Sequence, residues 1–205
     1  MAEHNEQPQA PPGEPTAPER PTPARAPAGP PPGERTPVKA AAQALAGGLA
    51  AAWDGIDYQP RFNFGDLEVT IAPEHVLIAA GRCAGDPALG FDYLMCISGV
   101  DHETSVELVY HLYSYVRRHQ LTIKVPLADY DHPAVDSVTA IWPAADWHER
   151  EAAEMLGIAF RGHPDLRPLL LDDDVDERPL RRSHPLVAVY ADRPGIVERP
   201  DDHGA

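Results

Sequence analysis

Residues 91–127 read FDYLMCISGVDHETSVELVYHLYSYVRRHQLTIKVPL, and this stretch decides the fold class. Residues 91–100 and 121–127 are mostly apolar, while 105–117 place alternate side chains on two faces with a period of two. A period of two is typical of β-strands, and the short loop DHETS between the first two segments predicts a hairpin. Three consecutive strands without a helical crossover predict a largely antiparallel sheet.

The segments on either side of this stretch mix strands with helices. Residues 67–71 (LEVTI) and 137–142 (SVTAIW) have the composition of short strands. Residues 38–53 and 72–86 favour helices, the second of which begins with a proline, and 144–156 favours a third helix that Gly157 would cap. The sequence therefore predicts an α+β fold with a mostly antiparallel sheet flanked by helices.

The two ends of the chain differ from this middle part. Residues 1–37 contain 12 of the 24 prolines and almost no aliphatic side chain, so they predict a disordered tail. Residues 38–160 would form the α+β domain. Residues 161–205 contain scattered leucines and several prolines without periodicity, which predicts an extended C-terminal arm that lies on another surface, of this chain or of a partner.

Composition and charge exclude several classes of protein. The 205 residues have a formal net charge of -15, which opposes binding to nucleic acid. No apolar run is long enough to cross a bilayer and no signal peptide is evident, so we expect a cytoplasmic protein. The only cysteines, Cys83 and Cys96, cannot complete an iron-sulfur cluster or a structural zinc site, so we expect no cofactor of this chain's own.

The helix at 144–156 contains the densest group of ionisable residues. A helical wheel places Glu151 in the middle of an apolar arc, and it places Arg150 and Glu154 on the solvated side. A carboxylate in such an arc needs a partner, and Arg161, Arg167, Arg181 or Arg182 could provide it. Two interpretations remain: a salt bridge that holds the C-terminal segment, or a carboxylate that handles protons or contacts another protein.

Two further groups of residues have alternative interpretations. The turn GHPDLR (162–167) contains the side chains of acid-base chemistry, but its glycine, proline and aspartate are also typical of a simple turn. His148 and Glu151 have the spacing of a di-metal helix, but no second such pair exists, so we expect no metal. The common nucleotide-binding and nucleophile motifs are absent from the sequence.

Three motifs resemble a known family: VYHLYS at 109–114, SVTAIWPAADWHEREAAEMLGIAFRGHPDLRPLL at 137–170, and RPLRRSHP at 178–185. Together they are similar to the 30 kDa, C-type subunit of the proton-pumping NADH-quinone oxidoreductase, respiratory complex I. The resemblance covers residues 65–186. The chain departs from the family pattern at Glu154, where aspartate is usual, and at Leu156, where phenylalanine is usual.

The resemblance implies a non-catalytic member of the peripheral arm, on the cytoplasmic side of the cell membrane. Such a chain would bind no cofactor and would dock on the D-type subunit that forms the quinone site, near the B-type and I-type subunits. The whole complex would use NADH, FMN, iron-sulfur clusters and quinone, and would couple electron transfer to proton translocation. The family signature and interface would comprise Glu149, Arg150, Glu151, Gly157, Gly162, His163, Pro164, Asp165, Arg167 and Arg181.

Two alternatives to this function remain open from the sequence. The chain could be the equivalent subunit of a membrane-bound [NiFe] hydrogenase-related complex, which shares this domain. It could also be a small free-standing enzyme that uses Glu151 and His163. Neighbouring genes would distinguish the two complexes, and turnover by the isolated chain would support the enzyme.

Overall fold

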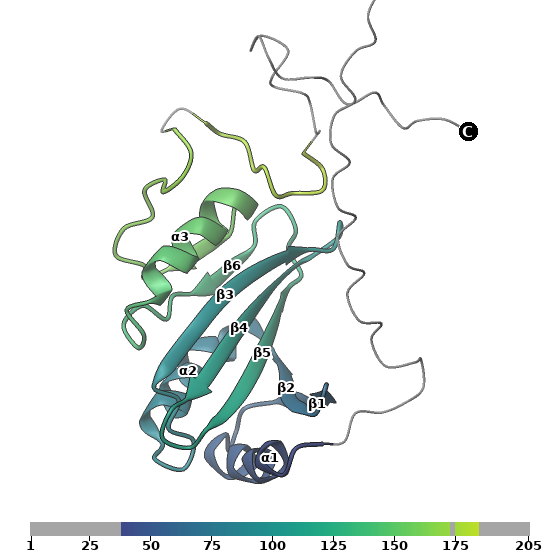
Figure 1. The fold of residues 1–205 in the computed structure, drawn as a ribbon. Coiled ribbons are helices and arrows are strands. Elements are labelled where there is room, and N and C mark those ends of the chain that lie inside the picture. The colour runs from purple at the N-terminus through teal and green to yellow at the C-terminus, as the bar shows by residue number, and fades with distance from the viewer. Residues whose placement is uncertain (1–37, 173–174, 185–205) are drawn as a thin grey trace, which may run out of the picture. The chain divides into compact units, whose positions relative to one another are not determined.

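The computed structural model describes residues 38–172 and 175–184, all within one compact unit of the chain. The predicted tail at 1–37 and the end of the predicted arm at 185–205 lie outside the described residues. The elements, shown in Figure 1, are α1 (Ala40–Ala52), β1 (Tyr58–Asn63), β2 (Asp66–Ile71), a 3-10 turn (Pro73–His75), α2 (Val76–Gly85), β3 (Tyr93–Asp101), β4 (Val106–Ser114), β5 (His119–Leu127), β6 (Ala134–Asp136), α3 (Ala145–Leu156) and β7 (Ala159–Arg161).

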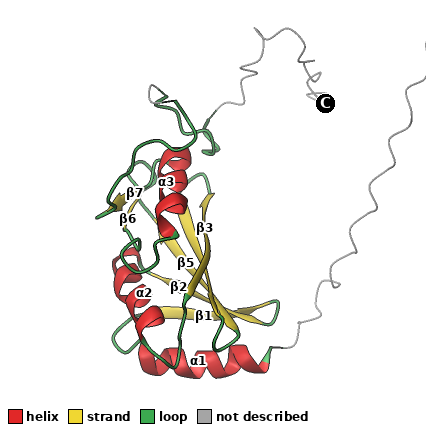
Figure 2. Cartoon of the chain, turned by 60° about the vertical axis from the view of Figure 1, so that its left-hand side comes forward, coloured by secondary structure: helices red, strands yellow, loops and turns green. Residues whose placement is uncertain are grey.

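The main sheet has five strands in the order β1-β2-β5-β4-β3. All neighbouring strands are antiparallel except β2 and β5, which are parallel. The α+β fold with a mostly antiparallel sheet and flanking helices is therefore confirmed (Figure 2). The hairpin of β3 and β4 is confirmed as well. The sequence analysis missed β1, because this edge strand is almost wholly exposed, contains Pro60 and lacks an apolar alternation.

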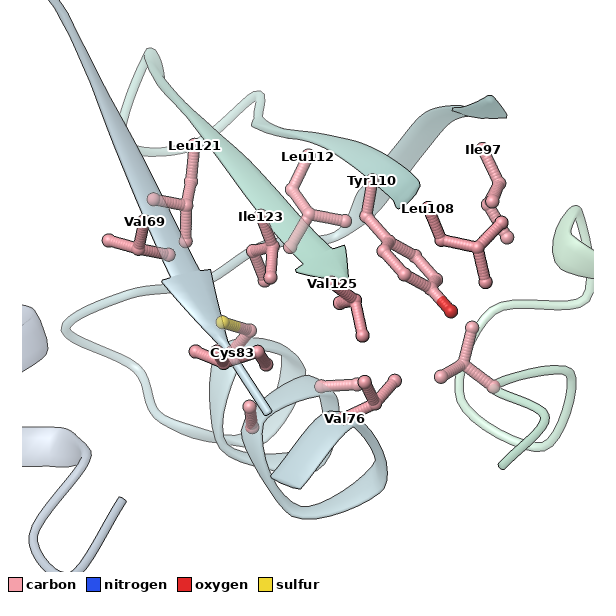
Figure 3. Close-up of a cluster of buried hydrophobic side chains, with 14 of the residues drawn as sticks. Val69, Val76, Cys83, Ile97, Leu108, Tyr110, Leu112, Leu121, Ile123 and Val125 are labelled. Carbon is pink, nitrogen blue, oxygen red and sulfur yellow. The ribbon is translucent and has the colours of Figure 1, made fainter. Parts of the chain in front are cut away.

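The core lies between the sheet and the first two helices. On β4, Val106, Leu108, Tyr110 and Leu112 alternate inward and are all buried, as the period of two predicted. Figure 3 shows that inward side chains of β2, β4 and β5 point toward α2. Cys83 of α2 is fully buried among them, and both cysteines are free thiols. In the described residues, no helix is long and apolar enough to cross a membrane.

The prediction of a strand at 137–142 is wrong. The strand in this region is β6, which pairs in parallel with β7 in a separate two-stranded sheet. Residues 137–142 instead form turns, in which the Val138 carbonyl accepts hydrogen bonds from the Ile141 and Trp142 amides. Val138 and Trp142 are buried at 0% and 5% exposure, so the apolar character of this segment reflects burial of a turn and not a strand.

Helix α3 lies close against β3, and this contact depends on a glycine. A Cβ atom added at Gly99 would overlap Leu156 Cδ1, and Leu156 is buried at the end of α3. The residue after it, Gly157, ends the helix with a φ of 71°, which confirms the predicted cap. The small residue on β3 therefore sets how closely α3 can approach the sheet.

We expect Gly99→Ala to lower the free energy of unfolding by about 1–3 kcal/mol, because the added methyl group overpacks the α3–β3 contact. Denaturant unfolding of the purified chain would measure the change. Gly81→Ala is the control, because nothing lies within 4 Å of a Cβ there and no loss is expected. In the Gly99→Ala, Leu156→Ala double variant, the cost of Gly99→Ala should shrink. An undiminished cost would contradict the overlap as its cause.

Candidate functional site

The set of buried residues on α3 differs in part from the helical-wheel prediction. It includes Ala145, Glu149, Ala152 and Leu156, which recur at spacings of three and four residues. Glu151 is exposed. The expectation that it lies within a buried apolar arc is therefore wrong. The wheel was centred on large apolar residues such as Trp147, which is 63% exposed in the structure.

Glu149, not Glu151, is the carboxylate buried at the base of α3. Its exposed fraction is 0%, and its Oε1 accepts a hydrogen bond of 2.8 Å from the Val138 amide. Its Oε2 is buried and has no hydrogen-bond partner in the described structure. Burial raises the pKa of Glu149, although hydrogen bonds from Ser137 and Val138 oppose that rise. This residue therefore fixes the turn that precedes α3 to the first half of the helix.

His163 fixes the GHPDLR turn to the same end of α3. Its side chain is fully buried, with Nε2 3.3 Å from both the carbonyl and Oδ1 of Asp146 and 3.9 Å from Glu149 Oε2. Its Nδ1 accepts a hydrogen bond of 3.0 Å from the Asp165 amide, so the ring hydrogen lies on Nε2. With Gly162 at a φ of 79°, the turn interpretation of this motif is the one that the geometry favours.

Glu154 holds the beginning of the C-terminal arm against α3. It is buried at 8% exposure, and its two carboxylate oxygens accept hydrogen bonds from three consecutive amides, those of Leu169, Leu170 and Leu171, at 2.6–3.2 Å. Arg150 binds the adjacent residues of the arm, because its guanidinium donates to the carbonyls of Arg167 and Pro168. The prediction that Arg150 and Glu154 form a pair on the solvated side is wrong.

The later part of the arm binds the far end of α3 and the loop after β5. Arg181 donates hydrogen bonds to the carbonyl of Leu156 at 2.6 Å and to that of Tyr130 at 2.8 Å. Its guanidinium also lies 4.3 Å from the centre of the Tyr130 ring, within range of a cation–π contact. These contacts link three segments that are far apart in the sequence.

Asp101, at the end of β3, completes this junction. Its carboxylate accepts hydrogen bonds from the Arg182 amide, the Tyr130 hydroxyl and the Glu103 amide at 2.7–2.9 Å. Burial opposes ionisation of Asp101, but these hydrogen bonds outweigh it and lower the pKa below the usual aspartate value. Sequence reasoning missed both Asp101 and Tyr130, because they lie outside the motifs and nothing local distinguishes them.

These contacts show on which surface the described part of the arm lies. Residues 162–172 and 175–184 have no helix and, apart from turns, no regular structure, as predicted. They contact this chain's own α3 and β3 through Glu154, Arg181 and Asp101, so of the two surfaces that the sequence left open, these residues lie on this chain's own.

The proposed signature residues have different places in the structure. The buried side chains of Glu149 and His163 are brought together, and Arg150 and Arg181 each anchor the arm. Asp165 accepts hydrogen bonds from Arg167 within the turn, which lower the pKa of Asp165 well below its usual range. Glu151 and Pro164 are exposed and outside these networks.

The site holds segments of the chain together, and its central ionisable side chains are buried. Glu149 and His163 are sealed from solvent, so a substrate could not reach either of them in this conformation. Among residues 38–172 and 175–184, no group of three or more histidine, cysteine or acidic side chains could hold a metal ion. The site therefore has the character of a structural junction at the base of a surface helix.

Comparison with known proteins identifies the family. Residues 69–190 match the family described as respiratory-chain NADH dehydrogenase, 30 kDa subunit. The chain belongs to this family. Within the family, the C-type subunit of the NADH-quinone oxidoreductase from Azorhizobium caulinodans is 37% identical over 162 residues, which are 77% of this chain and 72% of that protein. The C-type subunit from Roseiflexus castenholzii is 41% identical over 127 residues, 60% of this chain and 72% of that protein.

The fold is also similar to a chain from the membrane-bound sulfane sulfur reductase, an archaeal respiratory membrane complex. The TM-score is 0.64, and the match covers 78% of this chain and 95% of that chain. At 22% identity this likeness shows the fold alone. The matched family region contains both Glu149 and Glu154, so the junction described above lies within the part shared with the 30 kDa subunits.

Proposed function

We propose that this chain is a non-catalytic member of the peripheral arm of an NADH-quinone oxidoreductase and docks on the D-type subunit that forms the quinone site. The observation that carries this proposal is the presence of large exposed apolar side chains on α3 and the arm, which we call the docking surface. Trp147, Leu170 and Leu180 are 63%, 63% and 59% exposed on these segments, and exposed apolar side chains that gather on one surface mark contacts with other proteins. The same segments contain the motifs of the 30 kDa family.

The remaining features of the proposal follow from the family. The chain would bind no cofactor and would support electron transfer from NADH to quinone, coupled to proton translocation, through its partners. The B-type and I-type subunits would be its other neighbours, and the whole would lie on the cytoplasmic side of the cell membrane. The identities of 37% and 41% to curated NADH-quinone oxidoreductase subunits favour this function over the hydrogenase-related alternative.

The experiment is purification of the native complex through a tag on this chain, with identification of the co-purified subunits by mass spectrometry. Co-purification of NADH- and flavin-binding subunits together with the quinone-site subunit would support the proposal. Co-purification of hydrogenase subunits would instead support the hydrogenase-related complex. Metal analysis of the isolated chain, after reconstitution with iron and sulfide, tests the absence of a cofactor. A stoichiometric cluster would overturn that part of the proposal.

We expect the Trp147→Ala, Leu180→Ala double variant to reduce the amount of assembled complex severalfold, because it removes two large exposed anchors from the docking surface. Thermal unfolding of the isolated chain should change little, since both side chains are more than half exposed. The amount of complex is measured on native gels of membranes. Phe64→Ala is the control, because Phe64 is 70% exposed on the turn between β1 and β2, away from this surface. An equal loss in the control would contradict the assignment of the surface.

A further inference from the structure

A cavity beside the end of α3 has two arginines of the C-terminal arm in its lining. It has a volume of about 470 Å³ and is lined by Tyr130, Asp131, Gly157, Arg178, Arg181, Ser183 and His184. Asp131 is the one carboxylate in this lining, and among the described residues no ion pair joins it to Arg178. The chain as a whole has a net charge of -15, so two guanidinium groups around one cavity stand out from the rest of the surface. The cavity is adjacent to the docking surface but is not part of it.

The two arginines differ in how far their charges are compensated. Arg181 donates to the carbonyl of Leu156 at the negative end of the α3 dipole, and its charge also helps to lower the pKa of Asp101. Arg178 donates only to the carbonyls of its neighbours Asp176 and Glu177 among the described residues. No carboxylate in this part of the chain forms an ion pair with Arg178, whereas the nearby Arg182 pairs with Glu103 at 2.7 Å.

The position of Arg178 is set by the backbone at the end of α3. A Cβ atom at Gly157 would lie 3.0 Å from the Arg178 Nε, so the side chain lies directly on this glycine. The guanidinium therefore lines the cavity in a defined place. The Ser183 hydroxyl lies in the same lining and offers a further hydrogen-bond donor, whereas the His184 Nε2 lies 3.6 Å from the Glu177 carboxylate.

We propose that this cavity receives a carboxylate-bearing peptide segment of a partner protein in the complex, which forms an ion pair with Arg178. A planar guanidinium binds a carboxylate through two parallel hydrogen bonds, and the Tyr130 ring gives the cavity an apolar wall for the rest of the segment. The volume is several times that of a phosphate ion, which favours a peptide over a free anion. This inference rests on the proposed docking function and adds that the partner presents a carboxylate to Arg178.

The test uses Arg178→Lys in the assembled complex, followed by a carbodiimide that joins amines to carboxylates in direct contact. We expect a cross-linked peptide that joins position 178 to an aspartate or glutamate of another protein in the complex. Arg182→Lys is the matched control, and it should cross-link to Glu103 of this chain. Cross-links from position 178 only to acidic residues of this chain, or none while the control reacts, would overturn the inference.

A second measurement distinguishes binding of a partner peptide in the cavity from binding of a free anion. We expect Arg178→Gln to lower at least twofold the salt concentration that dissociates this chain from the complex, while Arg182→Gln should leave it unchanged. Inorganic phosphate is the probe for an anion site. Phosphate binding that is lost in Arg178→Gln, without any cross-link to another protein, would overturn the proposed peptide. If the complex assembles normally and no cross-link forms, this inference fails while the docking function stands; if no partner co-purifies, the docking function itself fails.

Discussion

Replacing Glu154 with alanine is expected to release the beginning of the arm from α3 and to lower the free energy of unfolding by about 2–4 kcal/mol. Glu154 is buried and accepts hydrogen bonds from the amides of three consecutive leucines, 169–171. Hydrogen bonds to a charged group contribute about 1.5–3 kcal/mol each, but the released amides can bind water, so the full sum is not lost. Because the arm is part of the proposed docking surface, the amount of assembled complex should fall with it.

Hydrogen exchange and denaturant unfolding of the isolated chain would measure this effect. Residues 169–171 should exchange much faster in Glu154→Ala than in the unchanged protein. Glu151→Ala is the matched control, because it removes an exposed carboxylate from the same helix and should alter neither measurement. Unchanged protection of residues 169–171 in Glu154→Ala would show that the leucine side chains hold the arm without the carboxylate.

Replacing Glu149 is expected to have opposite consequences for alanine and glutamine. Glu149→Ala leaves the buried Val138 amide without its acceptor and opens a small cavity, so it should cost about 2–4 kcal/mol. Glu149→Gln keeps a carbonyl oxygen for that amide and places no charge in the buried site. Its cost near neutral pH should therefore be small, and the variant should be as stable as the unchanged protein or more so.

The pH dependence of the free energy of unfolding, compared between Glu149→Gln and the unchanged protein, provides the sharper test. Burial raises the pKa of Glu149 in the folded chain above its ordinary value of 4.5. A raised folded pKa means that the contribution of this group to stability is complete below the unfolded pKa and is lost as the pH rises through the folded pKa. The free energy of unfolding of Glu149→Gln relative to the unchanged protein should thus increase as the pH rises above about 4.5. A difference that stays constant across this range would contradict the raised pKa.

The sequence alone determined the parts of this protein that depend on neighbouring residues. The period of two in 105–117 identified β4, the loop DHETS identified the hairpin, and Gly157 identified the end of α3. These features succeeded because alternation, turn composition and the left-handed backbone of a cap are local properties. The family motifs likewise pointed to the 30 kDa subunits, which the match at residues 69–190 confirmed.

Only the tertiary structure decided which side of α3 is buried and where the arm lies. The helical wheel chose the side with Trp147 and Glu151, because it counts apolar residues and ignores the space available. In the structure Leu156 packs on Gly99 of β3, and Glu149 is buried where its carboxylate accepts a hydrogen bond from the Val138 amide. Likewise, Glu154 is buried because the amides of residues 169–171 reach it. A buried carboxylate is stable only when distant backbone groups satisfy it, and a pattern within one helix cannot reveal those groups.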